Sequence, residues 1–474
     1  MKTIVNPNNL IKNLIGEQMP KDTEYRPLKY ILDVEVEEGV LLDNVITGQI
    51  VFLSREEKRV LDQLPMKPNE NEIMEYLVSA YYLVPVGFDE YKFVQGYRSI
   101  LQQIERNRKR PITKYTLFPT THCNARCFYC FESGFKKTNM DEETAKKVAE
   151  FIRQNTGGKQ AELSWFGGEP TVAIKCIDYI CGLLKEYGVD YVSGMVSNGY
   201  LFSKKVAEKA VRDWNLKSIQ ITLDGTEEVY NKTKSYNVSE SAYKRVLNNI
   251  YHMLDVGIRV TVLLNLDYHN SDDLFNLVDE LATRFKQYNN FRVSSHVLFN
   301  NEGYEKVHHT CDQEEELTEL NYKLAAHMAK IGLNGSVMGD VRAKKKLPVL
   351  RYAHCMANDT GAIVIAPNGK FFKCEHIEDD LASAAGIDTG GFSKAELDEW
   401  FVADEGERCS DCNLYPDCFT PKKCIDHATC YPVDSDSKIV GYKENIKDLY
   451  RATTQREEME KEETGKLPND SAGL

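Results

Sequence analysis

The sequence has no excess of positive charge and no long apolar run. Acidic residues outnumber basic residues by 72 to 59, which gives a formal net charge of -13. Attraction to a phosphate backbone therefore does not dominate its binding. The first twenty residues lack the apolar run of a secretory signal, and no later segment approaches the roughly 20 apolar residues that span a bilayer. We expect a cytoplasmic protein with no nucleic-acid and no membrane partner.

Cysteine, by contrast, is plentiful. There are 13 cysteines, an odd number that cannot all pair within one chain, and disulfides are rare in a reducing compartment. Ten of them form two spaced groups, whereas Cys176, Cys181 and Cys311 stand apart. Since Cys176 and Cys181 lie in an amphipathic run, we expect both to act as small buried hydrophobes.

Hydrophobic periodicity divides the chain into four parts. Residues 1–107 contain short alternating segments followed by helical stretches, and they predict a small α+β domain. Residues 108–330 alternate β-rich runs with amphipathic helices, which predicts a parallel α/β fold with its chemistry at the carboxyl ends of the strands. Residues 331–434 are dense in cysteine and poor in periodicity, so we expect loops organised around metal. Residues 435–474 predict a charged helix and a disordered tail.

The individual elements follow from the same periodicity. In the first part we expect strands at 30–36, 40–46 and 49–53 and helices at 55–64 and 70–82. The strands expected in the second part are 115–119, 161–166, 191–196, 217–223, 259–265 and 291–297. The helices expected between them are 141–154, 174–187, 204–213, 241–254 and 271–285.

The first cysteine group follows the first strand of the α/β part. Cys123, Cys127 and Cys130 have the spacing Cx3Cx2C. Three thiolates bind three irons of a [4Fe-4S] cluster and leave the fourth iron open for another ligand. This loop resembles that of the radical S-adenosylmethionine (SAM) superfamily, which has the same spacing and an aromatic residue, here Tyr129, before the last cysteine. The alternative is a structural zinc site with a fourth ligand from elsewhere.

The resemblance implies a partial (β/α)6 TIM-like barrel and a defined chemistry. In that superfamily SAM binds the open iron and is cleaved to methionine and a 5′-deoxyadenosyl radical. The turns after the later strands resemble its SAM-contacting segments, although Lys232 and Lys234 stand where an arginine is commoner. The residues that the resemblance assigns to SAM binding are Tyr129, Gly167, Gly168, Glu169, Pro170, Ser197, Asn198, Asp224 and Asn265.

The second cysteine group resembles the SPASM extension of radical SAM maturases, which holds two auxiliary [4Fe-4S] clusters. The resemblance assigns one complete cluster to Cys409, Cys412, Cys418 and Cys430, and three ligands of the other to Cys355, Cys374 and Cys424. Five residues separate Cys418 from Cys424 where the family usually has three, so the division of Cys424 and Cys430 is the least constrained part. With the first cluster, this makes three [4Fe-4S] clusters.

The second auxiliary cluster lacks a fourth cysteine, and two interpretations compete. A protein ligand such as His354, His376 or Cys311 would close the cluster. A substrate thiolate would instead position its sulfur for bonding to a carbon radical. For the late cysteines a zinc ribbon is the alternative.

The opening domain resembles, by size and position, the winged-helix-like PqqD-like element that recognises leader peptides by strand addition. Its alternative is a domain that only covers the barrel. Taken together, we expect a maturase of a ribosomally made precursor peptide, most similar to the ranthipeptide type that forms thioether crosslinks, with flavodoxin or ferredoxin as electron donor. Carbon-carbon crosslinking, epimerisation, formylglycine formation in sulfatases and a metal-stabilised peptide-binding module without catalysis stay open.

Overall fold

The computed structural model describes most of the chain. It covers residues 1–7, 23–68, 71–108, 110–238, 240–298, 311–338, 345–350, 355–376, 383, 385–403, 405–419 and 432–464. Only the backbone is described at residues 311, 312, 314, 394, 395, 432–435 and 457–464. Cys424, Cys430, His354 and the predicted tail from 465 onward therefore lie outside the described residues, as does the side chain of Cys311.

A nine-stranded sheet forms the barrel part of the molecule, in the strand order β13-β12-β11-β10-β9-β8-β7-β14-β15. The six strands expected from the sequence are neighbours in chain order, and all of their pairings are parallel. The sheet is open, because its edges β13 and β15 do not pair with each other. Its strands are β7 Lys114–Leu117, β8 Ala161–Trp165, β9 Tyr191–Ser197, β10 Leu216–Thr222, β11 Arg259–Leu266, β12 Phe291–Val297, β13 Gly335–Val337, β14 Ala362–Ile365 and β15 Phe371–Phe372.

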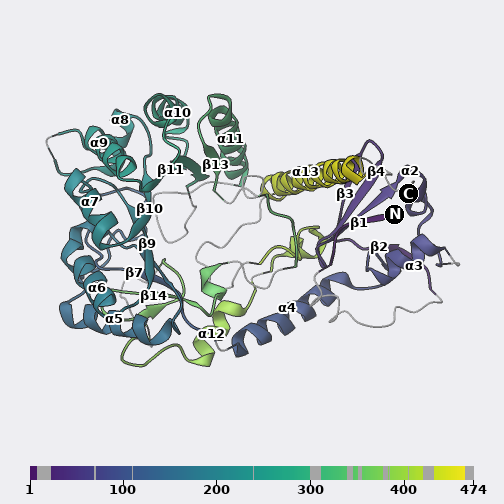
Figure 1. Cartoon of the computed structure of the whole chain (residues 1–474), viewed down its shortest axis with the longest axis horizontal. Helices are drawn as coiled ribbons and strands as arrows, with labels where there is room; N and C mark the ends of the chain where they lie inside the picture. Colours follow the sequence, from purple (N-terminus) through teal and green to yellow (C-terminus); the bar gives the residue numbers. More distant parts are fainter. Residues whose placement is uncertain are drawn as a thin grey trace, which may run out of the picture.

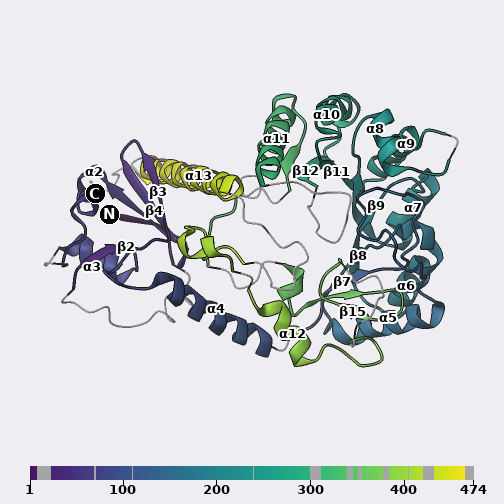
Figure 2. The same ribbon diagram turned by 180° about the vertical axis from the view of Figure 1, so that it is seen from behind.

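Helices cover the outer face of this sheet, as Figures 1 and 2 show in teal. They are α5 Glu142–Asn155, α6 Ile174–Glu186, α7 Lys204–Asp213, α8 Glu227–Lys234, α9 Ala242–Asp255, α10 Ser271–Phe285 and α11 Cys311–Lys330. Their apolar stripes face the strands because apolar residues recur at helical spacing, as in α5, where Ala145, Val148, Ala149 and Ile152 are buried. Cys181 is buried in this core and Cys176 packs against it, as expected.

The N-terminal region is an antiparallel sheet of four strands with helices beside it. The order is β1-β5-β4-β3, so the three expected strands gain a fourth, β1, at the edge next to β5. The bounds are β1 Lys2–Val5, β3 Ile31–Val36, β4 Gly39–Asn44, β5 Gln49–Ser54, α2 Arg55–Lys58, the short 3-10 helix Leu61–Gln63, α3 Glu72–Ser79 and α4 Glu90–Asn107. A separate pair joins β2 Tyr25–Pro27 to β6 Leu83–Pro85.

The third part differs from the expectation of loops alone. Strand β14 pairs in parallel with β7 and β15 returns antiparallel, so this segment extends the barrel sheet. The reason lies in the run from Ala362 to Ile365, whose four residues are all buried. Helix α12 Lys394–Phe401 and the 3-10 helices Pro170–Ala173, Met356–Asn358 and Glu407–Asp411 complete the described elements.

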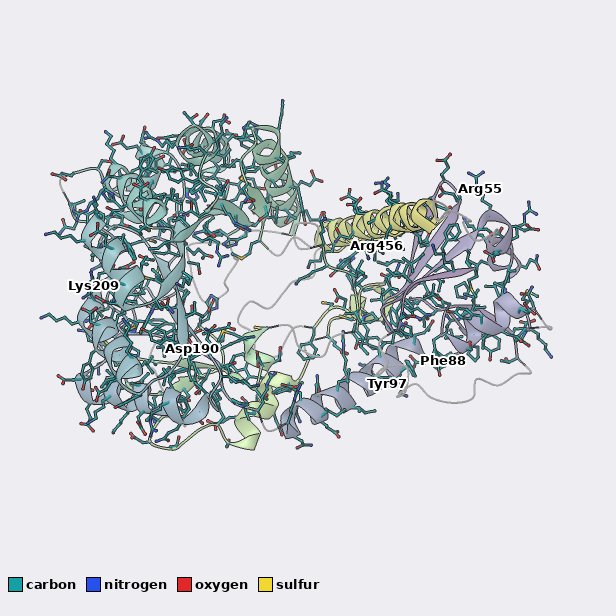
Figure 3. The ribbon with its side chains drawn as sticks, viewed as in Figure 1. Arg55, Phe88, Tyr97, Asp190, Lys209 and Arg456 are labelled. Carbon is teal, nitrogen blue, oxygen red and sulfur yellow. The ribbon has the colours of Figure 1, made fainter. Side chains whose placement is uncertain are left out.

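Two long helices join the barrel to the N-terminal region on opposite sides, as Figure 1 shows for α4 in blue and α13 in yellow. Helix α13 spans Pro432–Thr464 and contacts both α11 and β3. It begins earlier than the charged helix that the sequence predicts at 444–461. Tyr97 of α4, labelled in Figure 3, packs in a shared core with Leu414 and Tyr415 of the cysteine-rich part. Within the described residues, no helix combines the length and the apolar composition needed to cross a bilayer.

Candidate SAM and iron-sulfur site

The first cysteine group lies in a closed loop directly after β7. The loop is tied at its base, since the backbone N–H of Thr121 donates to the carbonyl of Thr138 at 2.9 Å and that of Met140 to Pro119 at 3.0 Å. Thr120 and Thr121, both fully buried, add side-chain hydrogen bonds across the same base. The three thiols are thereby presented at the carboxyl end of the first barrel strand, where α/β enzymes place their chemistry.

The three thiols are partly buried and influence one another electrostatically. Burial raises the pKa of Cys123 to about 11 and that of Cys130 to about 12, and it raises the pKa of Cys127 as well. Cys127 is near enough to both partners for its negative charge to raise their pKa values further. Thiolates are the ligands of iron-sulfur clusters, so three electrostatically coupled thiols on one loop fit the cluster that the spacing predicts. Binding such a cluster would release their protons.

The glycine pair of the next turn packs directly on this loop. A Cβ atom on Gly168 would stand 2.4 Å from the carbonyl oxygen of His122, and one on Gly167 would stand 2.5 Å from that of Thr120. Gly167 also has a φ of +109°, which side chains disfavour. Only glycine fits at both positions, and the backbone after β8 can therefore contact the cysteine loop.

Glu169 of the same turn joins the ends of β8 and β9. Its carboxylate accepts hydrogen bonds from Ser197 Oγ at 2.9 Å, from the backbone N–H of Asn198 at 2.7 Å and from that of Thr171 at 3.0 Å. It is 1% exposed. The carboxylate is thus occupied by protein donors, and its role is to hold the two turns together. Pro170 follows it as the first residue of a 3-10 helix.

Asn198 reaches back to the cysteine loop. Its side-chain amide donates to Asn124 Oδ1 at 2.7 Å and lies 3.9 Å from the sulfur of Cys123. The sequence assigned Asn198 to SAM without indicating this contact with the cluster loop. The structure therefore brings the first thiol and two of the predicted turns into one hydrogen-bonded assembly.

A buried charged triad lies on the other side of the loop. Tyr129 donates to Asp224 Oδ2, and Lys234 Nζ contacts that oxygen at 2.9 Å and the Tyr129 hydroxyl at 2.6 Å. Burial alone would lower the pKa of Lys234, but the carboxylate of Asp224 and neighbouring acidic groups raise it well above its ordinary value. Lys234 is therefore the cation that forms the ion pair with Asp224, whereas the sequence left Lys232 and Lys234 as alternatives. The other oxygen, Asp224 Oδ1, is buried without a hydrogen-bond partner among the described residues.

Asn265 is the penultimate residue of β11, at the same edge of the sheet. It is 7% exposed, and its register partner on β12 is His296. Asn270 donates to the carbonyl oxygens of Asn265 and Asp224 at 2.8 and 3.0 Å. Asn270 thus fixes the ends of two strands relative to each other, and sequence reasoning missed it because its partners are backbone atoms.

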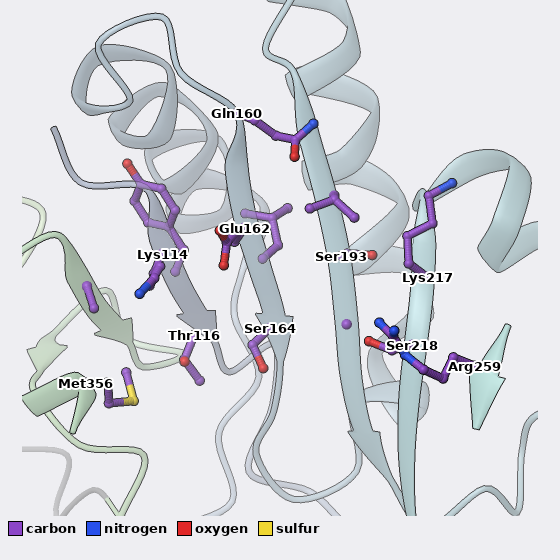
Figure 4. Close-up of a pocket in the computed structure, with 15 residues that line it drawn as sticks. Lys114, Thr116, Gln160, Glu162, Ser164, Ser193, Lys217, Ser218, Arg259 and Met356 are labelled. Carbon is purple, nitrogen blue, oxygen red and sulfur yellow. The ribbon is translucent and has the colours of Figure 1, made fainter. Parts of the chain in front are cut away.

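The inner face of the sheet is polar, unlike the packed interior of a closed barrel. One register row crosses β7 to β10 with the small residues Thr116, Ser164, Gly194 and Ser218. A cavity of about 440 Å³ lies over this row, as Figure 4 shows. The charged residues that line it are Lys114, Glu162, Lys217 and Arg259.

The second cysteine group separates into two places. Cys374 follows β15, near the barrel, and its sulfur lies 3.7 Å from Nδ1 of His376. The imidazole of His376 in turn packs on Phe131, next to Cys130, with 4.6 Å between the ring centroids. Cys355 is exposed at the start of a 3-10 helix that contacts β14.

Cys409 and Cys412 pack instead against the N-terminal region. Arg98 of α4 is only 3% exposed, and its guanidinium donates hydrogen bonds to the carbonyl oxygens of Tyr415 and Cys418. The guanidinium also lies 4.1 Å from the centre of the Tyr415 ring and forms an ion pair with Glu405 at 3.6 Å. Sequence reasoning did not find Arg98, because its partners lie more than 300 positions away. Among the described residues no three His, Cys, Asp or Glu side chains could hold a single metal ion. A four-iron cluster distributes its thiolates over separate irons, so it is a different requirement.

Comparisons with known proteins agree with this geometry. Residues 117–282 match the family model described as the Radical SAM superfamily. The chain is 25% identical over 176 residues to a probable GTP 3',8-cyclase of Thermococcus kodakarensis, covering 36% of this chain and 54% of that protein. It is 24% identical over 187 residues to a cysteine-type anaerobic sulfatase-maturating enzyme of Clostridium novyi, covering 36% and 48%. The match thus spans about half the length of these curated relatives.

Solved structures extend the likeness in fold. SuiB of Streptococcus suis bound to its precursor peptide SuiA superposes with a TM-score of 0.50 at 16% identity, covering 83% of this chain and 94% of that one. The enzyme anSMEcpe with bound AdoMet gives a TM-score of 0.55 at 14% identity, covering 72% and 99%. Residues 117–282 are therefore similar in sequence to the radical SAM superfamily, and the chain is similar in fold to SuiB and anSMEcpe. The expectation of a radical SAM α/β fold with a mainly parallel sheet is confirmed.

Proposed function

We propose that this protein is a radical SAM maturase that modifies a precursor peptide, with a thioether crosslink as its product. The observation that carries the proposal is the assembly of the three-thiol loop with the turns after β8, β9 and β10. If bound there, the first cluster would supply the electron for cleavage of SAM, and hydrogen would be abstracted from a peptide carbon. Forming the carbon-sulfur bond would release the thiol proton and one electron, which an auxiliary cluster would accept.

The residues around that loop have separate tasks in the proposal. Cys123, Cys127 and Cys130 hold the first cluster, and Gly167 and Gly168 allow backbone to approach the SAM amino group. The Glu169 carboxylate keeps the glycine turn and Asn198 in register. Tyr129 and Lys234 orient Asp224, whose second oxygen is buried with no partner in the described chain and is available to a SAM hydroxyl or amino group.

A peptide substrate is supported by the polar inner face of the sheet and by the N-terminal region. The row from Thr116 to Ser218 offers hydroxyl groups to a peptide backbone that crosses the barrel. The four-stranded sheet is where we assign PqqD-like leader recognition by strand addition. SuiB, which is similar in fold, was solved bound to the precursor peptide SuiA, and this is a reason for testing a precursor peptide here.

The remaining cysteines complete the proposal with two auxiliary [4Fe-4S] clusters. The separation of Cys374, beside the first loop, from Cys409 and Cys412, against α4, supports two separate cysteine sites, and a zinc ribbon stays the alternative for the late cysteines alone. Flavodoxin or ferredoxin is the proposed electron donor. A cytoplasmic location belongs to the same proposal, since thiols that bind iron need a reducing compartment.

A second candidate is formylglycine formation, favoured by the sequence similarity to the Clostridium novyi enzyme. It would oxidise a single residue of a sulfatase peptide and would not depend on a leader. Carbon-carbon crosslinking and epimerisation use the same site and differ only in product.

The test is anaerobic incubation of the reconstituted chain with SAM, reductant and a precursor peptide encoded beside its gene. We expect 5′-deoxyadenosine and a peptide that is lighter by two hydrogens per crosslink, with its cysteine protected from alkylation. Cys127→Ala should abolish both products. In D₂O, a peptide whose mass rises only by the increment of one deuterium at an α-carbon would identify epimerisation. The absence of 5′-deoxyadenosine from a fully loaded protein would reject the radical reaction.

A further inference from the structure

His376 stands between the two cysteine groups. Its ring contacts Phe131 of the first loop, with 4.6 Å between centroids, and its Nδ1 lies 3.7 Å from the sulfur of Cys374. Phe131 itself packs in a small apolar cluster with Phe118, Phe135 and Phe372. The imidazole is therefore held on one face by the loop of the SAM cluster and presents a ring nitrogen to an auxiliary-cluster cysteine.

The short distance distinguishes two roles for this nitrogen. Two ligands of one tetrahedral metal, with bonds of about 2.3 Å to sulfur and about 2.0 Å to nitrogen, stand roughly 3.5 Å apart. In a four-iron cluster each iron takes a single protein ligand. At 3.7 Å from the Cys374 sulfur, Nδ1 is thus too close to serve a different iron, but it is within hydrogen-bond reach of the sulfur.

We infer that His376 donates its Nδ1 proton to the Cys374 thiolate and tunes the auxiliary cluster without ligating it. The inference rests on the proposed function, which assigns a cluster to Cys374. A hydrogen bond to a ligating sulfur stabilises the more negative, reduced cluster and so raises its reduction potential. His376 is a positioning residue, and the fourth ligand of this cluster is then not His376.

The same geometry gives Phe131 a defined part. Phe131 is the residue after Cys130, so any movement of the first loop reaches the imidazole through a direct ring contact. The tilted packing, with 56° between the ring planes, leaves the imidazole edge with Nδ1 directed to sulfur. The potential of the auxiliary cluster is thereby linked to the loop that holds the SAM cluster.

The chain offers a matched control. His269 also packs on an aromatic residue of the first loop, with 4.9 Å between its ring centroid and that of Phe128. Its Nδ1 pairs with Asp267 at 2.8 Å instead of a cysteine sulfur. A change at His269 therefore removes a similar ring from the same loop while leaving the auxiliary site untouched.

The experiment uses the full-length chain, reconstituted without oxygen, in a Cys123→Ala/Cys127→Ala/Cys130→Ala background that lacks the SAM cluster. Iron content and a redox titration followed by electron paramagnetic resonance are measured for His376→Leu, His376→Gln and His269→Leu. We expect unchanged iron in all three. In His376→Leu, one titrating component should shift its oxidised-to-reduced ratio about tenfold toward oxidised at a fixed potential, which is about 59 mV for one electron.

His376→Gln, which keeps an N–H donor, should recover most of that shift, and His269→Leu should leave the titration unchanged. Loss of one cluster's iron in both His376 variants would make His376 a ligand and overturn the inference. An unchanged titration in His376→Leu would also overturn it. If the parent background binds no iron at all, the auxiliary-cluster assignment itself fails, which is a failure of the proposed function.

Discussion

Lys234 and Asp224 form a buried ion pair beside the first cysteine loop. The Lys234 ammonium lies 2.9 Å from Asp224 Oδ2, and the two side chains are 4% and 1% exposed. The backbone carbonyl of Lys234 also accepts a hydrogen bond from Arg126 of the loop at 2.8 Å. The pair therefore links the end of α8 to the loop and to the strand end after β10.

Breaking this pair from one side should be costly. Lys234→Met leaves a buried carboxylate without its cation, and Asp224→Asn leaves a buried ammonium, so each should lower the free energy of unfolding by about 3–5 kcal/mol. The double variant should lower the free energy of unfolding by less than the sum of the two single variants. Urea unfolding followed by the emission of Trp165 and Trp214, both buried in the barrel, measures this. As a control, Lys244→Met breaks the exposed ion pair with Glu227 and should lower the free energy of unfolding by less than about 1 kcal/mol. If the effects of Lys234→Met and Asp224→Asn were strictly additive in the double variant, the prediction would be contradicted.

A methyl group at Gly168 should disrupt the cysteine loop. It would stand 2.4 Å from the His122 carbonyl oxygen, so either the loop or the turn after β8 must move. We expect Gly168→Ala to lose most of the iron of the first cluster and its SAM cleavage while the auxiliary iron is retained. Gly182→Ala is the control, because a Cβ there meets nothing within 4 Å on helix α6 and alanine favours helix. Full iron loading of Gly168→Ala would show that the close approach is not required.

Arg98 should couple the N-terminal region to the late cysteines. Its guanidinium donates hydrogen bonds to the carbonyl oxygens of Tyr415 and Cys418 and forms an ion pair with Glu405. Arg98→Met removes donors from buried oxygens, at a cost of about 1–3 kcal/mol for each. We expect faster amide hydrogen exchange over residues 405–419 and along α4, measured by mass spectrometry. Arg108→Met, at a side chain 64% exposed, should leave exchange unchanged; equal effects of the two variants would reject the coupling.

The isolated thiols should react slowly and with a defined pH dependence. Burial raises the pKa of both Cys176 and Cys181 to about 12. The thiolate, which is the reactive form, is therefore scarce near pH 8 and increases about tenfold per pH unit as the pH rises toward 12. Alkylation of the metal-free protein, resolved by peptide mass, should modify the exposed Cys355 and Cys418 first. Rapid labelling of Cys181 at pH 8 would contradict its burial in the core.

Much of the barrel was predictable from local patterns. Every one of the six expected strands is present within two residues of its predicted ends, since alternating parallel strands and amphipathic helices leave clear periodic signals. The two flanking strands β13 and β14 were not expected. Gly335–Val337 is only three residues long, and the apolar run of Ala362–Ile365 is short enough to be taken for part of a loop.

The candidate site divides in the same way. The spacing of Cys123, Cys127 and Cys130 predicts a cluster loop, and the turns after the next strands are predicted to bind SAM; the structure brings the loop and these turns into contact. No local pattern indicated that the Glu169 carboxylate would accept hydrogen bonds from Ser197 and Asn198, since those donors lie at the end of another strand. The assignments of Cys424 and Cys430 stay predictions, because both lie outside the described residues.

By itself the sequence determined where the barrel strands and helices form, because periodicity marks them, and it predicted the kind of chemistry, because thiol spacing favours a particular metal cluster. Only the tertiary structure decided the partners: Arg98 with the carbonyl of Cys418, Lys234 with Asp224, and His376 with both Phe131 and Cys374. Most of these contacts join residues that are far apart in the chain. Their energy depends on burial and orientation, which exist only once the sheet has brought its strand ends together.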